Sequence, residues 1–180
     1  MIKLKGLGEY MINLSTPVQN ENVSQLRVGD KITLSGYIYT GRDAVLPKVV
    51  ELANNDKLKD KGINLEGSVI FHTAVSKAGV GPTSSNKFEI ESSFEPLSKL
   101  GVKIHLGKGS INKETVMILD KYNAVYAITP PVTALLNSKT IEQKVIAFPE
   151  LGMEAMHLLK IDRFPIIVAA VHGKSIYREG

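Results

Sequence analysis

The chain has 180 residues, of which 43% are hydrophobic and 22% charged, as in ordinary globular proteins. A chain of this length can bury roughly two-thirds of its unfolded surface, so we expect a single domain over residues 1–180. No apolar run approaches the ~20 residues of a membrane helix, and residues 166–171 have the length of a buried strand. The first residues lack the apolar stretch of a secretory signal, so we expect a cytoplasmic protein.

Cysteine is absent from the chain. The chain by itself therefore offers no disulfide, thiol nucleophile or cysteine-held zinc or iron–sulfur site. The four histidines, at positions 72, 105, 157 and 172, lack the i,i+3 or i,i+4 spacing of a local metal motif. If the chemistry requires a metal, another chain must supply its ligands.

The net charge of +4 and the pI near 9.2 are compatible with nucleic acid, a membrane surface or a small anion as the partner. The lysines are interleaved with acids, as in residues 56–61, and tryptophan is absent. Because no basic stripe with aromatic residues is present, nucleic acid is the least favoured partner.

The pattern of the first half predicts a leading strand before the polar residues 19–24, two further strands, two helices and a long loop. Residues 31–39 alternate in polarity as a strand does, and residues 67–74 are rich in Val, Ile and Phe. Between them, residues 43–53 are predicted to form a helix with Asp43 as N-cap and Pro47 in the first turn. Residues 77–86 form a Gly-, Pro- and Ser-rich loop of a kind that is often functional. A helix that ends near Gly101 should follow it.

The second half predicts a regular alternation of strands and helices, which is typical of a mixed sheet with helices packed on it. The predicted strands are residues 102–106, 124–128, 145–148 and 164–171, with a short one at 174–177. The predicted helices are residues 112–122, 130–136 and 151–159.

Polar or glycine-rich segments follow several predicted strands, where open α/β sheets bind ligands. Arg42 could grip a carboxylate, or point into water while Asp43 caps the helix. The hydroxyls of residues 83–85 could bind an anion at a helix N-terminus, or cap that helix. Lys108 between two glycines offers a point charge, although such lysines are common in solvated turns. His172 after the last strand is either a packing residue or a catalyst.

The order of these segments resembles the β-subunits of the class I fumarases and tartrate dehydratases, which are two-subunit iron–sulfur hydro-lyases. The resemblance covers about residues 14–177. The matching motifs, in chain order, are Ser15-Thr16-Pro17, Leu26-Arg27-Val28-Gly29-Asp30, Leu34-Ser35-Gly36, Arg42-Asp43, Gly81-Pro82-Thr83-Ser84-Ser85, Gly107-Lys108-Gly109, residues 151–155 and residues 164–173.

The resemblance implies a swivelling β/β/α domain docked on a larger α-subunit, in an α2β2 assembly, or a homodimer when isolated. The α-subunit would carry three cysteines that hold a [4Fe–4S] cluster. Arg42, Lys87, Lys108 and Ser84 would bind the substrate, and Thr83 would transfer the carbon-bound proton. The reaction would be the reversible hydration of a short dicarboxylate, with fumarate to malate as the leading prediction.

Three departures from the family pattern leave the substrate open. Leu46 stands in the segment where the family has a histidine or another basic residue, and residues 129–131 replace small residues. Lys87 stands where fumarases usually carry an arginine, which exchanges a bidentate fork for a point charge. The alternatives are therefore a tartrate dehydratase β-subunit, or a domain that binds a small anion or a partner without turnover.

Overall fold

The computed structural model describes residues 2–6, 9–76, 79–80 and 87–177. Its strands are β1 (Ile2–Gly6), β2 (Glu9–Ser15), β3 (Lys31–Thr40), β4 (Val69–Phe71), β5 (Val75–Ser76), β6 (Gly79–Val80), β7 (Ile104–Gly107), β8 (Val125–Ile128), β9 (Thr140–Ala147), β10 (Met156–Val171) and β11 (Lys174–Ser175). Its helices are α1 (Asn20–Ser24), α2 (Leu46–Asn54), α3 (Lys87–Ser92), α4 (Phe94–Lys99), α5 (Lys113–Lys121) and α6 (Thr133–Ser138), with 3₁₀ turns η1 (Lys59–Lys61) and η2 (Pro149–Glu154). The predicted mixed α/β class is confirmed.

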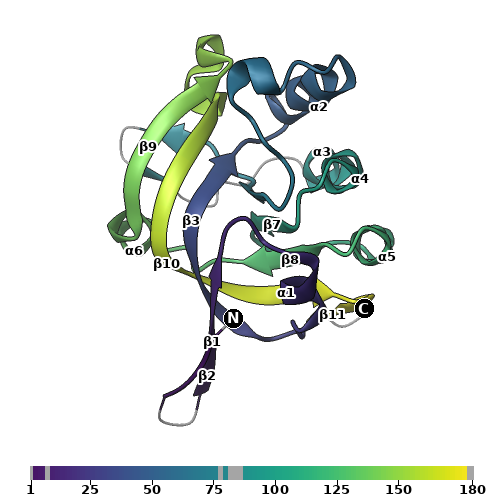
Figure 1. Ribbon diagram of the computed structural model, residues 1–180, viewed down its shortest axis with the longest axis vertical. Coiled ribbons are helices and arrows are strands. Elements are labelled where there is room, and N and C mark those ends of the chain that lie inside the picture. Colours follow the sequence, from purple (N-terminus) through teal and green to yellow (C-terminus); the bar gives the residue numbers. More distant parts are fainter. Residues whose placement is uncertain (1, 7–8, 77–78, 81–86, 178–180) are drawn as a thin grey trace.

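The main sheet closes on itself. Strands β3, β4, β7 and β8 pair in parallel in that order, and β10 then pairs antiparallel with β8. A further antiparallel pairing between β10 and β3 joins the two ends of this row into a ring. Parallel β2 and antiparallel β1 extend the sheet beyond β3 as a projecting arm, and β9 pairs with the outer edge of β10 (Figure 1).

Strand β10 makes the closure possible because it is long and bent. Its first half pairs with both β3 and β9, and its second half pairs with β3 and β8. The register shifts between Ile161 and Phe164, where Arg163 adopts a positive φ of 49°. Such a bulge bends a strand and increases its twist, which lets one strand turn the corner of a small barrel.

The predicted helix over residues 151–159 is wrong. Residues 149–154 form the 3₁₀ turn η2, and residues 156–159 belong to β10. The segment Met156-His157-Leu158-Leu159 has no strong local preference that separates helix from strand. Its backbone groups instead pair with β3 on one side and β9 on the other, so tertiary pairing determines its conformation.

Strand residues alternate between the inside of the ring and an outer layer that helices cover. Ile38 and Leu159 are fully buried in the inner cluster, together with Phe71 and Phe164, whose rings pack edge to face. The next residue, Tyr39, instead packs outside the ring. Helices α2, α4 and α5 lie on one side of the strands (Figure 1) and cover these outward residues. Among the described residues no helix is long and apolar enough to cross a membrane.

Most other predicted elements are confirmed with shifted ends. The predicted strands overlap β3, β4, β7, β8, β9, β10 and β11, and the predicted helix over residues 112–122 is α5, capped by Asn112. The helix predicted to end near Gly101 is the pair α3 and α4. Its C-cap is Leu100, and Gly101 follows with a φ of 104°.

Three element boundaries differ for physical reasons. Helix α2 begins at Leu46 because the carbonyl of Arg42 accepts hydrogen bonds from Val45 and Leu46, which forms a separate turn first; Asp43 is therefore not its N-cap. Helix α6 begins at Thr133 because two prolines precede it, and the residue before a proline favours an extended backbone. Strand β9 starts at Thr140, where its residues 141–145 are exposed and their polarity does not alternate as in a half-buried strand, so the prediction began it too late.

Candidate functional site

The end of β3 is the best-defined of the predicted ligand positions. Gly41 follows this strand, and its N–H donates to the carbonyl of Phe71 at 3.0 Å. A Cβ at Gly41 would lie 2.8 Å from side-chain atoms of Val45 and Leu46. Only glycine therefore lets the chain turn this closely into α2, and the turn fixes where Arg42 leaves the sheet.

Arg42 is held by an acid of its own chain. Its Nε donates to Oε2 of Glu154 at 3.1 Å, and its Nη2 bonds to the other carboxylate oxygen, so the contact is bidentate. The two side chains are 17% and 25% exposed. The carboxylate of Asp43 lies 4.0 Å from Nε. The alternative in which Arg42 points into water is therefore wrong, and a substrate carboxylate cannot take the same two donors while Glu154 holds them.

A threonine and a histidine lie close in sequence to the two residues of this ion pair. Thr40 is the last residue of β3, and His157 pairs with it in register near the start of β10. The N–H of His157 donates to Oγ1 of Thr40 at 3.3 Å, and both side chains are buried. The segments 40–42 and 154–157 are thus joined at two places, by this hydrogen bond and by the Arg42–Glu154 pair.

Lys108 lies in a turn that a hydrogen bond from the neighbouring strand β8 holds in place. The hydroxyl of Tyr126 donates to the carbonyl of Gly109 at 3.0 Å, and Gly109 has a φ of 77°. Gly107 packs closely against this side chain, since a Cβ there would lie 3.1 Å from the Tyr126 hydroxyl and would require it to shift. Burial raises the pKa of Tyr126, which keeps the donor protonated. Lys108 itself is exposed, and no ion pair holds it within the described part of the chain.

The remaining predicted site residues lie in or next to the loop before α3. Thr83 and Ser84 lie outside the described residues. Lys87 is the first residue of α3, whose position is fixed by Glu91. The Glu91 carboxylate accepts from the backbone N–H of Asn112 at 3.0 Å and from the Asn112 side chain. It also accepts from Thr115 at 3.2 Å, which ties α3 to the N-terminus of α5.

Histidines 72 and 105 form a buried chain that the sequence did not reveal. Nε2 of His72 lies 3.0 Å from Nδ1 of His105, and Nε2 of His105 lies 2.9 Å from Oγ of Ser98. The ring of Phe94 stacks on His105 with 4.3 Å between centroids. Nδ1 of His72 is enclosed without a hydrogen-bond partner. Burial lowers the pKa of His72 to about 3 and that of His105 well below its usual value, so both remain neutral.

These buried histidines predict an acid-sensitive fold. Both are neutral when folded and titrate near their ordinary pKa of about 6.5 when unfolded, so the unfolded chain binds more protons at acidic pH. The contribution of the two histidines to the free energy of unfolding is therefore fully present above pH ~6.5. Below that pH the free energy of unfolding falls, by up to about 1.4 kcal/mol per pH unit for each histidine. We expect His72→Gln to reduce this slope by about one histidine's share. Urea unfolding between pH 7 and 5 measures it, with His172→Asn as the control. Equal slopes for His72→Gln and the parent chain would contradict the assignment.

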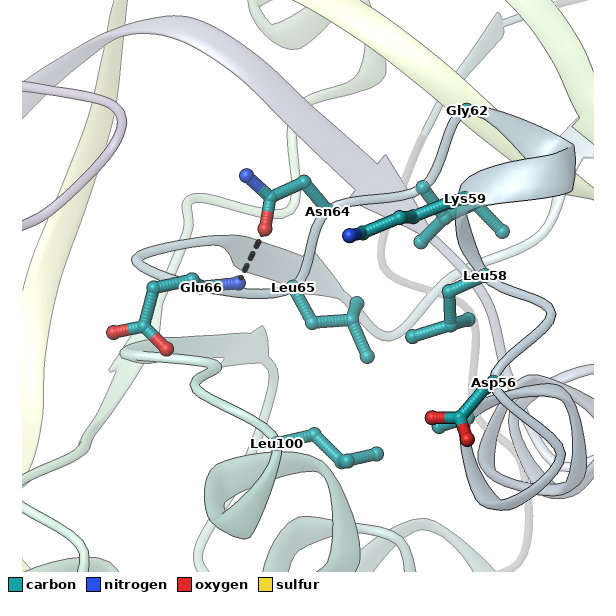
Figure 2. A pocket seen from close by; sticks show the side chains of 10 residues that line it. Asp56, Leu58, Lys59, Gly62, Asn64, Leu65, Glu66 and Leu100 are labelled. Carbon is teal, nitrogen blue, oxygen red and sulfur yellow. Dashed lines mark hydrogen bonds between the residues drawn. The ribbon is translucent and has the colours of Figure 1, made fainter.

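The other candidates are placed away from the Arg42 edge. His172 lies at the far end of β10 and contacts the carbonyl of Val23 through Nε2 at 3.2 Å, which is a packing role. A cavity of about 790 Å³ opens at the amino ends of β4 and β7. It has an apolar floor that includes Leu65 and Leu100, with Lys59 and Glu66 around it (Figure 2). Since Arg42 and Lys108 follow the opposite ends of their strands, this cavity is separate from the predicted site.

Comparisons with known proteins identify the family of the chain. The profile of the family described as "Fumarase C-terminus" matches residues 3–180. A putative L(+)-tartrate dehydratase subunit beta of Methanocaldococcus jannaschii is 34% identical, over 95% of this chain and 92% of that protein. The L(+)-tartrate dehydratase subunit beta of Escherichia coli K12 is 33% identical, over 92% of this chain and 86% of that protein. A putative class I fumarate hydratase of Geobacillus stearothermophilus is 27% identical over 94% of this chain, which spans 34% of that longer protein.

The family profile covers nearly the whole chain, and two of these relatives exceed 30% identity with most of both chains aligned. The motifs that predicted the resemblance lie in the matched region, from Ser15 to Gly173. The chain belongs to the fumarase C-terminus family.

Proposed function

We propose that this chain is the β-subunit of a two-subunit hydro-lyase that removes water from, or adds water to, a short dicarboxylate. The observation that carries the proposal is the share of each relative's length that this chain spans. The chain spans 92% and 86% of two proteins named as β-subunits of L(+)-tartrate dehydratase. It spans only 34% of a putative class I fumarate hydratase. A domain that is one part of a longer enzyme in one relative, and a separate subunit in others, is expected to act with a partner chain.

The partner would be an α-subunit that holds the [4Fe–4S] cluster. The residues of this chain do not fit such a group, since clusters of this kind are held by cysteine thiolates and the chain has no cysteine. The described residues also contain no group of three or more histidine, aspartate or glutamate side chains that could hold a metal ion. We propose an α2β2 assembly in which residues 1–180 form one domain of the swivelling β/β/α type.

The part of this chain in the reaction would be to bind a dianion and to move a proton. Arg42, Lys87 and Lys108 would supply positive charge to the two carboxylates, with Ser84 as a further hydrogen-bond donor. Thr83 would take the proton from carbon when water is lost and return it when water is added. The support for these roles is the match of the motifs. For Arg42 and Lys108 it is also their position after β3 and β7, neighbours of β4 in the sheet.

Removal of either described cation tests the substrate contacts. In the reconstituted complex, Arg42→Ala and Lys108→Ala should each lower kcat/KM about 10- to 150-fold, chiefly through KM. The reason is that each loses a charge-assisted contact to a carboxylate. Lys57→Ala serves as the matched control, since Lys57 is an exposed lysine that follows the C-terminal end of α2. Unchanged kinetics in both variants would show that the two residues are surface charges.

The effect of Arg42→Ala is harder to interpret, because removal of Arg42 also leaves the Glu154 carboxylate without its bidentate partner. Part of the effect of Arg42→Ala could then be loss of stability. The double variant Arg42→Ala with Glu154→Gln removes both charges together. If Arg42 binds substrate, the double variant should regain melting temperature and keep the defect in kcat/KM. Recovery of both quantities would assign the pair to the fold alone.

A further inference from the structure

His157 faces the inside of the ring at its β3 end. It pairs in register with Thr40, and two residues further along the strands Leu159 pairs with Ile38. Leu159 and Ile38 are members of the inner cluster. Because side chains alternate along a strand, His157 and Thr40 lie on the same inner face, at the point where the apolar interior ends. This is the histidine nearest in the chain to Glu154 and its partner Arg42.

The backbone fixes the tautomer of this histidine. Nδ1 of His157 lies 2.9 Å from the carbonyl oxygen of Ala155, which can only accept. Nδ1 therefore carries the proton, and Nε2 carries a lone pair when the ring is neutral. Burial lowers the pKa of His157, against a smaller opposing effect of the Ala155 carbonyl, and this favours the neutral ring. The ring thus presents a neutral hydrogen-bond acceptor.

Nε2 of His157 has no hydrogen-bond partner within the described part of the chain and is not fully enclosed. The fully enclosed side-chain atoms without a partner among the described residues are Oγ of Ser68 and Nδ1 of His72, so Nε2 of His157 is not fully enclosed. The residue as a whole is only 6% exposed. A mostly buried ring with an unpaired acceptor that is not fully enclosed can receive a donor from outside.

The chemistry of the donor and of the substrate determines which group could bind Nε2. A carboxylate has no proton to donate to Nε2, and the acids Glu154 and Asp43 already lie around Arg42. A hydroxyl can donate. In a 2-hydroxy dicarboxylate, the hydroxyl that leaves as water must gain a proton, so a lone pair does not assist it. A hydroxyl on the neighbouring carbon stays in the product and can donate to Nε2 throughout the reaction.

We propose that His157 is a specificity-determining residue whose Nε2 accepts a hydrogen bond from a second hydroxyl, on the carbon next to the one that loses water. This inference rests on the proposed hydro-lyase function and names its substrate class, a dicarboxylate hydroxylated on both central carbons. L(+)-tartrate has this second hydroxyl, and malate does not. A site that contains an acceptor for a substrate hydroxyl discriminates against the analogue without it, because the acceptor is then left unpaired.

Substitutions of His157 distinguish the roles of its two ring nitrogens. Asparagine places an amide N–H near Nδ1 and can keep the contact to Ala155, whereas glutamine reaches the position of Nε2 and can keep the acceptor. The measurement is the ratio of kcat/KM for L(+)-tartrate to that for malate, in the complex of this chain with its α-subunit. We expect His157→Phe and His157→Asn to lower the ratio about tenfold, the size of one neutral hydrogen bond. We expect His157→Gln to change it less than threefold. His172→Asn, at the other end of β10, is the control and should leave the ratio unchanged.

The outcomes distinguish this inference from the proposed function. If the complex turns over neither fumarate, malate nor tartrate, the proposed function fails. If it turns over fumarate and malate but not tartrate, the function stands and the role of His157 is overturned. The role is also overturned if tartrate is a substrate and all three His157 variants keep the parent ratio. If asparagine keeps the ratio and glutamine does not, His157 acts through its contact to Ala155, and the inference is wrong.

Discussion

Thr83→Ala should reduce kcat by about 10² to 10⁴-fold in the assembled enzyme, with little change in KM. Thr83 follows Gly81-Pro82 in the segment that matches the family motif most fully, and it precedes Ser84 and Ser85. A threonine hydroxyl is a weak base, so it needs a dry site and an acid of the partner subunit that accepts the proton from it. Thr83→Ser should retain part of the activity because the hydroxyl survives.

The alternative role for Thr83 is a helix cap, which predicts a different pair of measurements. Loss of a cap costs about 1 kcal/mol of stability and leaves kcat intact. Measurement of kcat and melting temperature for the alanine and serine variants, both in complex with the α-subunit, therefore separates catalysis from capping. An alanine variant that melts earlier but turns over at the parent rate would remove Thr83 from the mechanism.

The spacing of apolar residues predicted the elements that have one face toward the core and another toward solvent. Strand β3 and helix α5 are of this kind, and the sequence placed both within a few residues. Strand β10 could not be found in this way over its first half. Its conformation there depends on pairing with β9, the preceding strand, and at the same time with β3, which lies far away in sequence. The closure of the sheet depends on the same pairing, so a mixed sheet was predictable and its ring was not.

The candidate site, like the fold, was predictable only in part from the sequence. The sequence identified Arg42 and Lys108 because each follows a strand in a glycine-containing turn. It could not show that Glu154 grips Arg42, since the two residues are 112 positions apart. The sequence assigned no role to His157, which lies inside the segment 151–159 that was predicted to be helical. Its place beside Thr40 follows from the register of β10 on β3, and its fixed tautomer follows from a backbone carbonyl.

The Arg42–Glu154 pair also bears on how the subunits would work together. A bidentate partner fixes the orientation of the guanidinium before substrate arrives, which reduces the entropy lost on binding. The two acids near Arg42 also oppose the approach of an anion. Further cationic residues, Lys87 and Lys108 among them, and cationic groups of the partner chain would then be needed to hold a dianion. A site of this charge pattern is expected to be incomplete in the isolated β-subunit.

The most direct test of the two-subunit account is an assay of the purified chain, with and without its α-subunit, under anaerobic conditions. Hydration of fumarate and dehydration of malate and L(+)-tartrate are the three reactions to follow. The account predicts no turnover of any of them by the chain alone, since it has no cysteine to hold a cluster. It predicts turnover of at least one once the α-subunit is added. Turnover by the single chain, free of any α-subunit, would contradict the account.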